Sequence, residues 1–553
     1  MKTKYVFFII LGLSNAVSSH AKTGIDCRII RPEWSEQDEK NYQDFVARIG
    51  QAVEQKKCGT VDGCMKSPAN IYRSTDPAGL KFENDCGRLS PALRAYFACK
   101  NGLPFSLVTS VAPRDLPGND KRDIRYNRWG NRVTSRKDVI TKKSTFRTKY
   151  PSIQSVLHHL VDHYYTASYR IYYGDTDKAP FFADYYPVDI TRDAVRPGTV
   201  IYDPNGHVVT VYRVEDDGRV RFIDSHPDNS LTAGTYGKQF VRSNPGQGAG
   251  FKYWRPLKLV NATRNNEGAY VGGNIIGALN SKLPFYSTVQ FLGTTPPKDG
   301  DADWKAGTFE FDGQRMDFYS WVRSRLSRGN LRLQPRNEMR NRVADICEAL
   351  QDRVEAVNIA VTAGVNNQAH PARLPDNIYG TSGDWETYSS PSRDARLKVA
   401  YLDLIDQSKQ WIAMWKSRDP RLDYSGANLA QDVLDVYQSE SRSCQIQYRN
   451  SVGTNVTLNL DDIRKRLFKL SFDPYHCAEL RWGAVAGREA STCRDDSNKR
   501  LWFEREQFLR NQPDRTYDIP MGFSLDELAT WRPGNGIKET PDADIVKFLE
   551  SHK

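Results

Sequence analysis

The sequence predicts an α+β N-terminal domain, in which helices pack on an antiparallel sheet, followed by a mainly α-helical C-terminal domain. Apolar residues recur at helical spacing over 35–57, 90–102 and 152–170. A β-branched, strand-like pattern then replaces them over 198–224. Helices first and an antiparallel meander second are the order of an α+β domain. Helical periodicity returns in the C-terminal part, over 335–362, 394–416, 428–447 and 460–470.

The boundaries of several predicted elements carry local signals. Ser35 and Asp38 before the first helix resemble a capping box, with Asp in place of the usual Glu. Three strands are predicted over 199–202, 207–214 and 219–223. The Asp-Asp-Gly sequence at 216–218 is a hairpin turn, so it should pair the last two strands antiparallel.

Composition changes after Pro256. The chain becomes rich in Gly, Asn, Pro and Asp, with weak strand character and no fixed-period repeat. We therefore predict four segments along the chain. They are a signal peptide (1–21), a first domain (22–257), an irregular linker (258–315) and a mainly helical domain of unknown role (316–553).

The first residues have the features of a secretory signal. Lys2 and Lys4 precede an apolar run over 5–13, and Ser19 and Ala21 are the small residues that a signal peptidase needs. The run is shorter than the roughly 20 residues that span a bilayer, and no later stretch is long and apolar enough. We expect cleavage after Ala21 and no integral membrane segment. An uncleaved anchor is the alternative.

The chain is basic but shows no nucleic-acid signature. Its formal net charge is +11, with 26 % charged and 39 % hydrophobic residues, so it is globular rather than disordered. No compact Lys/Arg tract is present, and we predict no nucleic-acid partner. A basic exported protein suits a polyanionic surface such as a cell wall, and a simply solvated basic surface is the alternative.

Nine cysteines follow the predicted signal, and nine is an odd number. If one is a free nucleophile, eight remain for four disulfides in an oxidising compartment. Cys58 and Cys64 enclose a short loop and are candidates to pair locally, although spacing does not determine connectivity. No C-x-x-C element is present, so a zinc site is not expected. The other candidates for mutual pairing lie towards the C-terminus: Cys347, Cys444, Cys477 and Cys493.

The sequence Asp85-Cys86-Gly87 precedes a predicted amphipathic helix. The start of a helix lowers the pKa of a thiol, Asp85 is a candidate N-cap, and Gly87 would let a substrate approach the backbone. The N–H of Cys86 is a candidate oxyanion donor. Pro91 leaves two alternatives open: the helix begins at Ser90, with Cys86 on the preceding turn, or it kinks at Pro91.

A histidine and a carboxylate complete a candidate catalytic group. His207 stands at the start of one predicted strand and Asp224 at the end of the next, across the hairpin. Antiparallel pairing brings the two ends of such a hairpin together, so Asp224 could orient the imidazole. The order Cys86, His207, Asp224 is that of a thiol hydrolase with nucleophile, base and orienting carboxylate.

Other polar residues are weaker candidates. His226 could bind substrate or replace Asp224 as the orienting group, and a polar turn is the alternative. Arg125 or Arg128 in the insert could bind a carboxylate, and a solvated loop is the alternative. His159 and His163 have the i, i+4 spacing of metal ligands, but the glutamate of a zinc peptidase is missing, and we predict no metal.

Two stretches resemble a known family. Residues 85–105 (DCGRLSPALRAYFACKNGLPF) resemble the nucleophile helix of the NlpC-like branch of papain-superfamily cysteine peptidases, and 197–224 resemble its "PGDLVFF…GHVGIYL" strands. The resemblance covers about 70–256 and implies Cys86 as nucleophile, His207 as base and Asp224 as third polar residue. It implies a papain-like fold and hydrolysis of amide bonds in cell-wall peptides. Gly87-Arg88 stands where that family has Ser-Gly.

The sequence therefore predicts a periplasmic or secreted thiol hydrolase that cleaves amide bonds in a peptide or peptidoglycan substrate, without a cofactor. Asp85, Gly87, Arg125 and His226 are the predicted substrate-binding residues. An acyltransferase or transglutaminase that uses the same dyad is one alternative. A non-catalytic envelope protein, with Cys86 held in a disulfide, is the other.

Overall fold

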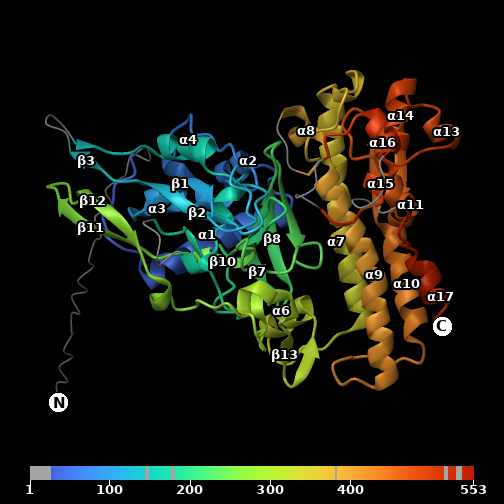
Figure 1. Cartoon of the computed structure of the whole chain (residues 1–553), viewed down its shortest axis with the longest axis horizontal. Coiled ribbons are helices and arrows are strands. Elements are labelled where there is room, and N and C mark those ends of the chain that lie inside the picture. Colours follow the sequence, from blue (N-terminus) through green and yellow to red (C-terminus); the bar gives the residue numbers. More distant parts are fainter. Residues whose placement is uncertain (1–25, 144–147, 176–180, 380–382, 516–520, 531–538) are drawn as a thin grey trace, which may run out of the picture.

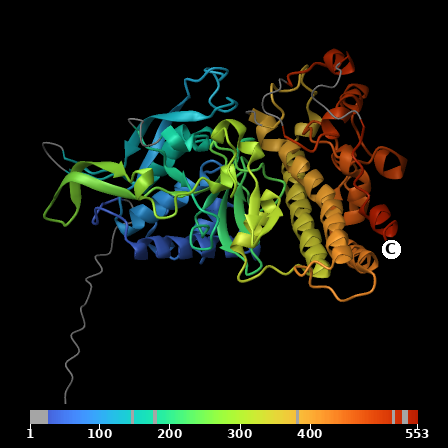
Figure 2. The same ribbon diagram turned by 60° about the horizontal axis from the view of Figure 1, so that its bottom comes forward.

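The computed structural model describes residues 26–143, 148–175, 181–379, 383–515, 521–530 and 539–553. The predicted signal peptide lies outside these residues. The described chain forms a mixed α+β part with a large antiparallel sheet and a helical C-terminal part that stands beside it (Figure 1). The two parts stay side by side when the view is turned (Figure 2). Among the described helices, none has the length and apolarity needed to cross a membrane.

Six antiparallel strands form the central sheet, in the order β5-β10-β6-β7-β8-β9. Its middle strands are buried along most of their length, and they include the three that the sequence predicts. The Asp-Asp-Gly turn does join β7 to β8. The strands are β5 (Tyr185–Pro187), β6 (Val200–Asp203), β7 (His207–Val214), β8 (Val220–Ser225), β9 (Leu231–Thr235) and β10 (Gly250–Trp254).

Helix α1 (Glu36–Glu54) packs against this sheet. The predicted capping box is present, because the Ser35 side chain accepts from the N–H of Asp38 and Asp38 accepts from that of Ser35. Gly50 faces Tyr212 on β7 so closely that a Cβ at position 50 would lie 2.1 Å from the ring. Only glycine allows the helix to lie this close to the strand.

Helix α3 (Leu89–Asn101) is almost wholly buried, and it ends at Gly102 with φ +65°. Helix α4 ends at His163, short of the predicted 170, and a 3₁₀ turn over Thr166–Tyr169 follows. The other elements before the sheet are small. They are α2 (Val61–Lys66), β1 (Ser106–Pro113), β2 (Asn131–Asp138), β3 (Lys142–Lys143), β4 (Thr148–Lys149) and α4 (Ile153–His163).

The predicted linker at 258–315 is not irregular. Strands β11 and β12 form a long antiparallel hairpin, and short elements follow it. The first hydrophobic core continues through Trp321 to Leu326, so it extends well past the predicted boundary at 257. Gly268 and Gly313, both with positive φ, lie in hairpin turns of this segment. The elements are β11 (Leu257–Arg264), β12 (Tyr270–Gly277), α5 (Val289–Leu292), β13 (Phe309–Phe311), β14 (Gln314–Met316) and α6 (Phe318–Leu326).

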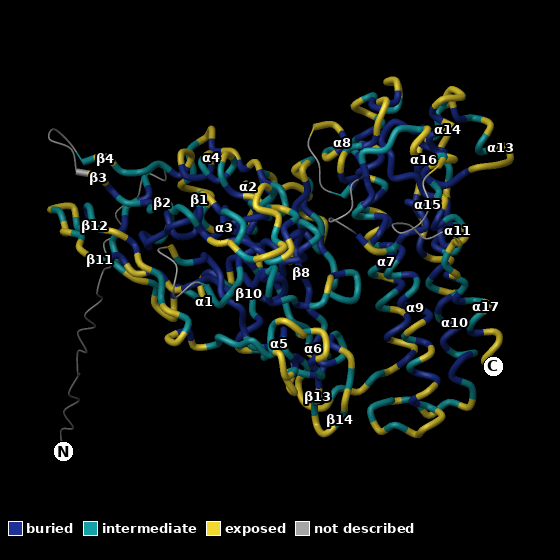
Figure 3. Tube along the Cα trace, in the orientation of Figure 1, coloured by how far each residue is buried: buried dark blue, intermediate teal, exposed yellow. Residues whose placement is uncertain are grey.

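Three long helices build the C-terminal part and enclose a second apolar core, separate from the first (Figure 3). Helix α7 also lies against β9, where Asp345 and Glu348 pair with Arg221 of β8. The elements are α7 (Pro335–Thr362), α8 (Gly383–Tyr388), α9 (Pro391–Ser417), α10 (Leu429–Ser443), β15 (Gln445–Arg449), β16 (Asn455–Asn459), α11 (Leu460–Arg466), α12 (Ala478–Arg481), α13 (Gly487–Ala490), α14 (Ser497–Arg505), α15 (Gln507–Arg510), α16 (Leu525–Thr530) and α17 (Ile545–Glu550).

Eight of the nine cysteines form four disulfides, and Cys86 is free. The predicted local pair Cys58–Cys64 is present. The four C-terminal cysteines pair with one another, as Cys347–Cys444 and Cys477–Cys493. The remaining disulfide joins Cys27 to Cys99 of α3 and closes a separation of 72 residues.

Candidate active site

Cys86 lies on a turn immediately before α3 and not within the helix. The helix begins at Leu89, so the first of the two alternatives, with the cysteine on the preceding turn, is closer to the structure. Pro91 lies in the first helical turn, where its missing N–H has no helical acceptor to lose. The thiol of Cys86 points at the start of β7, where it donates to the carbonyl oxygen of Gly206 at 3.9 Å.

The two residues that flank Cys86 make local contacts that hold this turn. Asp85 does not cap α3: its Oδ1 accepts from the N–H of Arg88 at 3.0 Å, and its other oxygen pairs with the Arg88 guanidinium at 2.9 Å. Gly87 does not open the backbone to substrate either. A Cβ there would lie 2.9 Å from the Thr166 nitrogen, because the segment 165–166 already occupies this space. The Gly87 carbonyl accepts from the Tyr169 hydroxyl.

His207 and Asp224 meet across paired strands. Nε2 of His207, the first residue of β7, lies 2.8 Å from Oδ2 of Asp224 near the end of β8. An ionised carboxylate only accepts, so Nε2 carries the proton and Nδ1 is left as the basic nitrogen. Among the described residues, Nδ1 of His207 has no hydrogen-bond partner. This tautomer is the one that a general base needs.

A second histidine lies on the same carboxylate. Nε2 of His226 is 3.6 Å from Oδ2 of Asp224 and 3.1 Å from the Thr232 hydroxyl, and its ring is nearly parallel to that of His207. Although burial alone would raise the pKa of Asp224, the two imidazoles hold it well below its usual range. Asp224 is therefore ionised at neutral pH.

A cleft of about 750 Å³ contains these groups. Cys86, His207 and His226 line one wall together with Asp85. Arg125 stands at its edge with 57 % of its side chain exposed, 3.6 Å from Asp123. Of the predicted site residues, Gly87 and Asp224 lie behind this wall rather than in it. The helical part supplies the opposite wall: Ile378, Tyr379, Glu386, Ser389, Ser390, Pro391, Ser392, Arg393 and Arg396.

The electrostatics of the cleft differ from the sequence prediction. Burial raises the pKa of the Cys86 thiol well above its usual range, and the carboxylates of Asp85 and Asp224 raise it further. Burial lowers the pKa of His207, against the opposing effect of Asp224. The predicted lowering by a helix start fails because the thiol lies outside the helix. In the free protein the pair is therefore a neutral thiol and a neutral imidazole.

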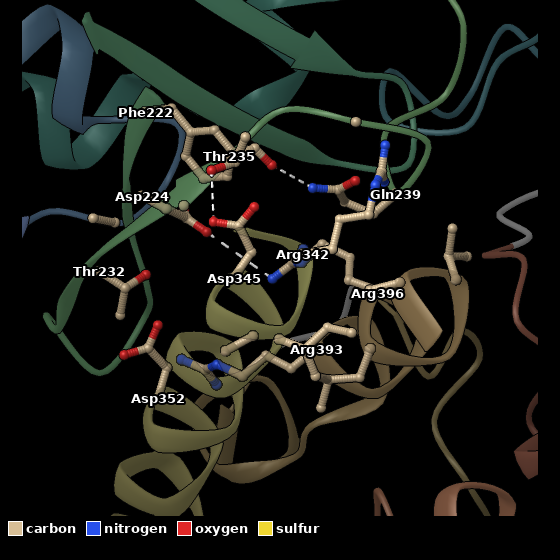
Figure 4. A pocket seen from close by; sticks show the side chains of 18 of the residues that line it. Phe222, Asp224, Thr232, Thr235, Gln239, Arg342, Asp345, Asp352, Arg393 and Arg396 are labelled. Atoms are coloured by element: carbon tan, nitrogen blue, oxygen red, sulfur yellow. Dashed lines mark hydrogen bonds and ion pairs between the residues drawn. The ribbon is translucent and has the colours of Figure 1, made fainter. Parts of the chain in front are cut away.

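A smaller cavity of about 160 Å³ adjoins the cleft, between the sheet and helices α7 and α9 (Figure 4). Asp224 enters it from the sheet, and Arg393 and Arg396 enter it from α9. His226, Arg393 and Arg396 line both spaces. Asp352 of α7 also lies here, and burial raises its pKa to about 7.

The sequence alone gave no signal for the residues of the helical part. Arg393 and Arg396 follow Cys86 by more than 300 positions, in a region without a motif. Arg515 is a further case: it reaches back from the helical part to pair with the buried Asp203 on β6, four positions before His207. Only packing of the two parts brings these residues to the cleft.

Two other histidine groups lie away from the cleft. The rings of His159 and His163 on α4 have centroids 4.2 Å apart and are tilted by 49° to one another. In the helical part, ligand atoms of His370, Asp473 and Glu506 lie within 4.8 Å of one another and are buried, so these side chains could hold a metal ion. His370 instead lies 2.7 Å from Asp473 through a direct hydrogen bond.

Comparison of the chain with protein-family models, with curated proteins and with solved structures found no match.

Proposed function

We propose that this protein is an exported thiol hydrolase that cleaves amide bonds by Cys86–His207–Asp224 catalysis, with cell-wall peptides as the substrate class. The observation that carries the proposal is that a free cysteine lines one cleft with a histidine whose ring is hydrogen-bonded to a carboxylate behind it. Eight cysteines are bonded and Cys86 is not, and its sulfur contacts the residue before His207. This constellation supports acyl transfer through a thioester.

The reaction would follow from the positions of these groups. As the sulfur attacks the carbonyl carbon, Nδ1 of His207 takes the thiol proton. The C–N bond then breaks, and the leaving nitrogen receives that proton. Water next donates a proton to His207 and its hydroxyl to the acyl carbon, which breaks the C–S bond and restores the thiol. Asp224 stabilises the imidazolium that forms in each half.

The neutral resting state has a consequence for this mechanism. Because burial favours the thiol over the thiolate, proton transfer to His207 would accompany attack rather than precede it. The backbone N–H of Cys86 has no acceptor among the described residues, so it is available to an oxyanion. The mechanism uses no metal or cofactor.

The four disulfides are consistent with an oxidising compartment, which supports a periplasmic or secreted location. The proposal also includes a papain-like fold for the first part, based on the resemblance of residues 85–105 and 197–224. A helix that follows the cysteine, packed on an antiparallel sheet that carries the histidine, supports this relation.

The test is hydrolysis of purified sacculi and of synthetic stem peptides, with products identified by mass spectrometry. We expect release of amine and carboxylate fragments by the wild type and none by Cys86→Ala or His207→Ala. His158→Ala is the matched control, because His158 is 74 % exposed on α4 and outside the cleft. Full activity in either active-site variant would refute the assignment. Conjugates with an added amine, in place of hydrolysis, would indicate an acyltransferase.

A further inference from the structure

Two arginines of helix α9 have almost no partners although they are largely buried. The side chains of Arg393 and Arg396 are only 14 % and 16 % exposed. Their closest carboxylates are Asp228 at 3.7 Å and Asp224 at 4.0 Å, and both distances are too long for hydrogen bonds. Among the described residues neither guanidinium donates a hydrogen bond, and Nε of Arg393 and Nη1 of Arg396 are buried without an acceptor.

Another buried arginine of the same region donates hydrogen bonds within the chain, although its Nη1 also lacks an acceptor among the described residues. Arg353 of α7 is fully buried, and it donates two hydrogen bonds to Asp394 and one to the carbonyl of Ser471. A guanidinium presents five N–H donors, and leaving them unpaired in a buried position is unfavourable. Arg393 and Arg396 therefore need acceptors that the chain itself does not supply.

The place of these arginines indicates what the acceptors are. Both line the cleft that contains Cys86 and His207, and both enter it from the first two turns of α9. The positive end of the helix dipole favours an anion at the same point. The N–H groups of Ser392 and Arg393 lie in this first turn and have no acceptor among the described residues. Planar guanidinium groups match the two oxygens of a carboxylate.

The carboxylates within 4.0 Å of the two arginines, Asp228 and Asp224, do not line the cleft, whose described acidic lining residues are Glu83, Asp85 and Glu386. Glu386 lines the same cleft as Asp85 and Cys86, and its pKa is raised by burial and further by the charge of Asp85. Arg396 instead lies 4.0 Å from Asp224, and its charge adds to burial in lowering the pKa of His207. The cleft thus presents carboxylates beside the thiol and, near His207 and Asp224, guanidinium groups that donate no hydrogen bond within the described part of the chain.

We propose that Arg393 and Arg396 form a binding site for a carboxylate group of the substrate, on the His207 side of the cleft. The identity of the ligand as substrate rests on the proposed hydrolase function. The first part of the chain then supplies the reacting groups of the site. The helical part supplies the residues that determine which substrate binds. Substrates would be peptides with a free carboxylate close to the amide that is cleaved.

Binding can be measured without turnover in the full mature chain carrying Cys86→Ala. The probes are glutarate, a dicarboxylate, and glutaramide, its neutral diamide of similar shape, titrated by saturation-transfer NMR. We expect saturable binding of glutarate that weakens with added chloride, and at least tenfold weaker binding of glutaramide. Arg393→Gln and Arg396→Gln should each weaken glutarate binding by about tenfold or more, and Arg396→Lys by less.

The matched control is Arg373→Gln, because Arg373 lies in the helical part outside the cleft and is 57 % exposed. Its binding of glutarate should be unchanged, and circular dichroism would show that each variant is folded. Equal binding of glutarate and glutaramide, or unchanged glutarate binding in both Gln variants, would overturn the proposal. This binding measurement does not depend on bond cleavage. A protein that binds glutarate through these arginines but hydrolyses no peptide would support the carboxylate site and refute the hydrolase function.

Discussion

Nε2 of His207 lies 2.8 Å from Oδ2 of Asp224, and this contact joins the first residue of β7 to the end of β8. The two residues are 17 positions apart, and the antiparallel hairpin between them brings them together. The contact fixes the tautomer in which Nδ1 is basic.

Asp224→Asn should lower the rate of amide hydrolysis by about 10²–10⁴-fold, because an amide neither fixes this tautomer nor stabilises an imidazolium. The substitution keeps the shape of the side chain, so the thermal midpoint should change far less than the rate. Steady-state kinetics on one synthetic peptide would check this. A variant with wild-type kcat would show that the histidine works without the carboxylate.

Cys86 should react slowly with iodoacetamide at neutral pH and faster as the pH rises above 9. The raised pKa of the buried thiol is the reason, because only the thiolate is nucleophilic. Alkylation of the oxidised protein, read by mass spectrometry across a pH series, would measure it. Rapid alkylation below pH 7 would contradict the neutral thiol. Alkylation of any second cysteine would contradict the four disulfides.

Gly87→Ala should destabilise the protein and displace the turn that carries Cys86. A Cβ at this position meets backbone atoms of 165 and 166 at 2.9–3.0 Å, and backbone cannot rotate away as a flexible side chain can. We expect a loss of about 1–3 kcal/mol in the free energy of unfolding, with reduced activity. Gly79→Ala is the control, since a Cβ there meets nothing within 4 Å. Equal stability of the two variants would contradict the close approach.

The disulfides should differ in their contribution to stability. Cys27–Cys99 spans 72 residues and Cys58–Cys64 spans 6. Loop-closure entropy predicts about 4 kcal/mol for the first and about 2 kcal/mol for the second. Urea unfolding of the two double-Ser variants would compare them. A larger loss for the short loop would show that native-state effects, not chain entropy, set the contribution of these disulfides.

Acid should destabilise the fold through His226. Burial lowers its pKa to about 3, and the charge of Arg393 lowers it further, against Asp224 and Asp228. The unfolded chain binds this proton near pH 6.5, so stability falls as the pH drops from about 6.5 towards 3. Thermal midpoints of the wild type and His226→Gln across this range would measure it. The variant should lose part of the pH dependence, and parallel curves would exclude His226 as the cause.

Much of the local structure could be predicted from the sequence. The capping box at Ser35, the turn at 216–218 and the helix over 335–362 all form, because each depends on neighbours within a few residues. The pairing of His207 with Asp224 belongs here too, since a short hairpin fixes it. The odd number of cysteines predicted one free thiol, and Cys86 is free.

Other features depend on contacts between distant segments, and the sequence prediction failed there. Gly87 was expected to let a substrate approach the backbone, but the segment 165–166 packs against it. Asp85 was expected to cap the helix, but it pairs with the guanidinium of Arg88. The linker at 258–315 was expected to be irregular, but its glycines turn a regular hairpin. The thiol was expected to be acidic, but burial by the rest of the fold makes it neutral.

The sequence by itself determined the candidate nucleophile, its base and the carboxylate behind that base, because residue type and short-range register define them. Only the tertiary structure decided the second wall of the cleft. Arg393 and Arg396 come from a region without a motif, and they reach the site because α7 and α9 pack against the edge of the sheet. The burial that raises the pKa of Cys86 and lowers that of His207 also depends on the tertiary structure, because burial is a property of all neighbours in space.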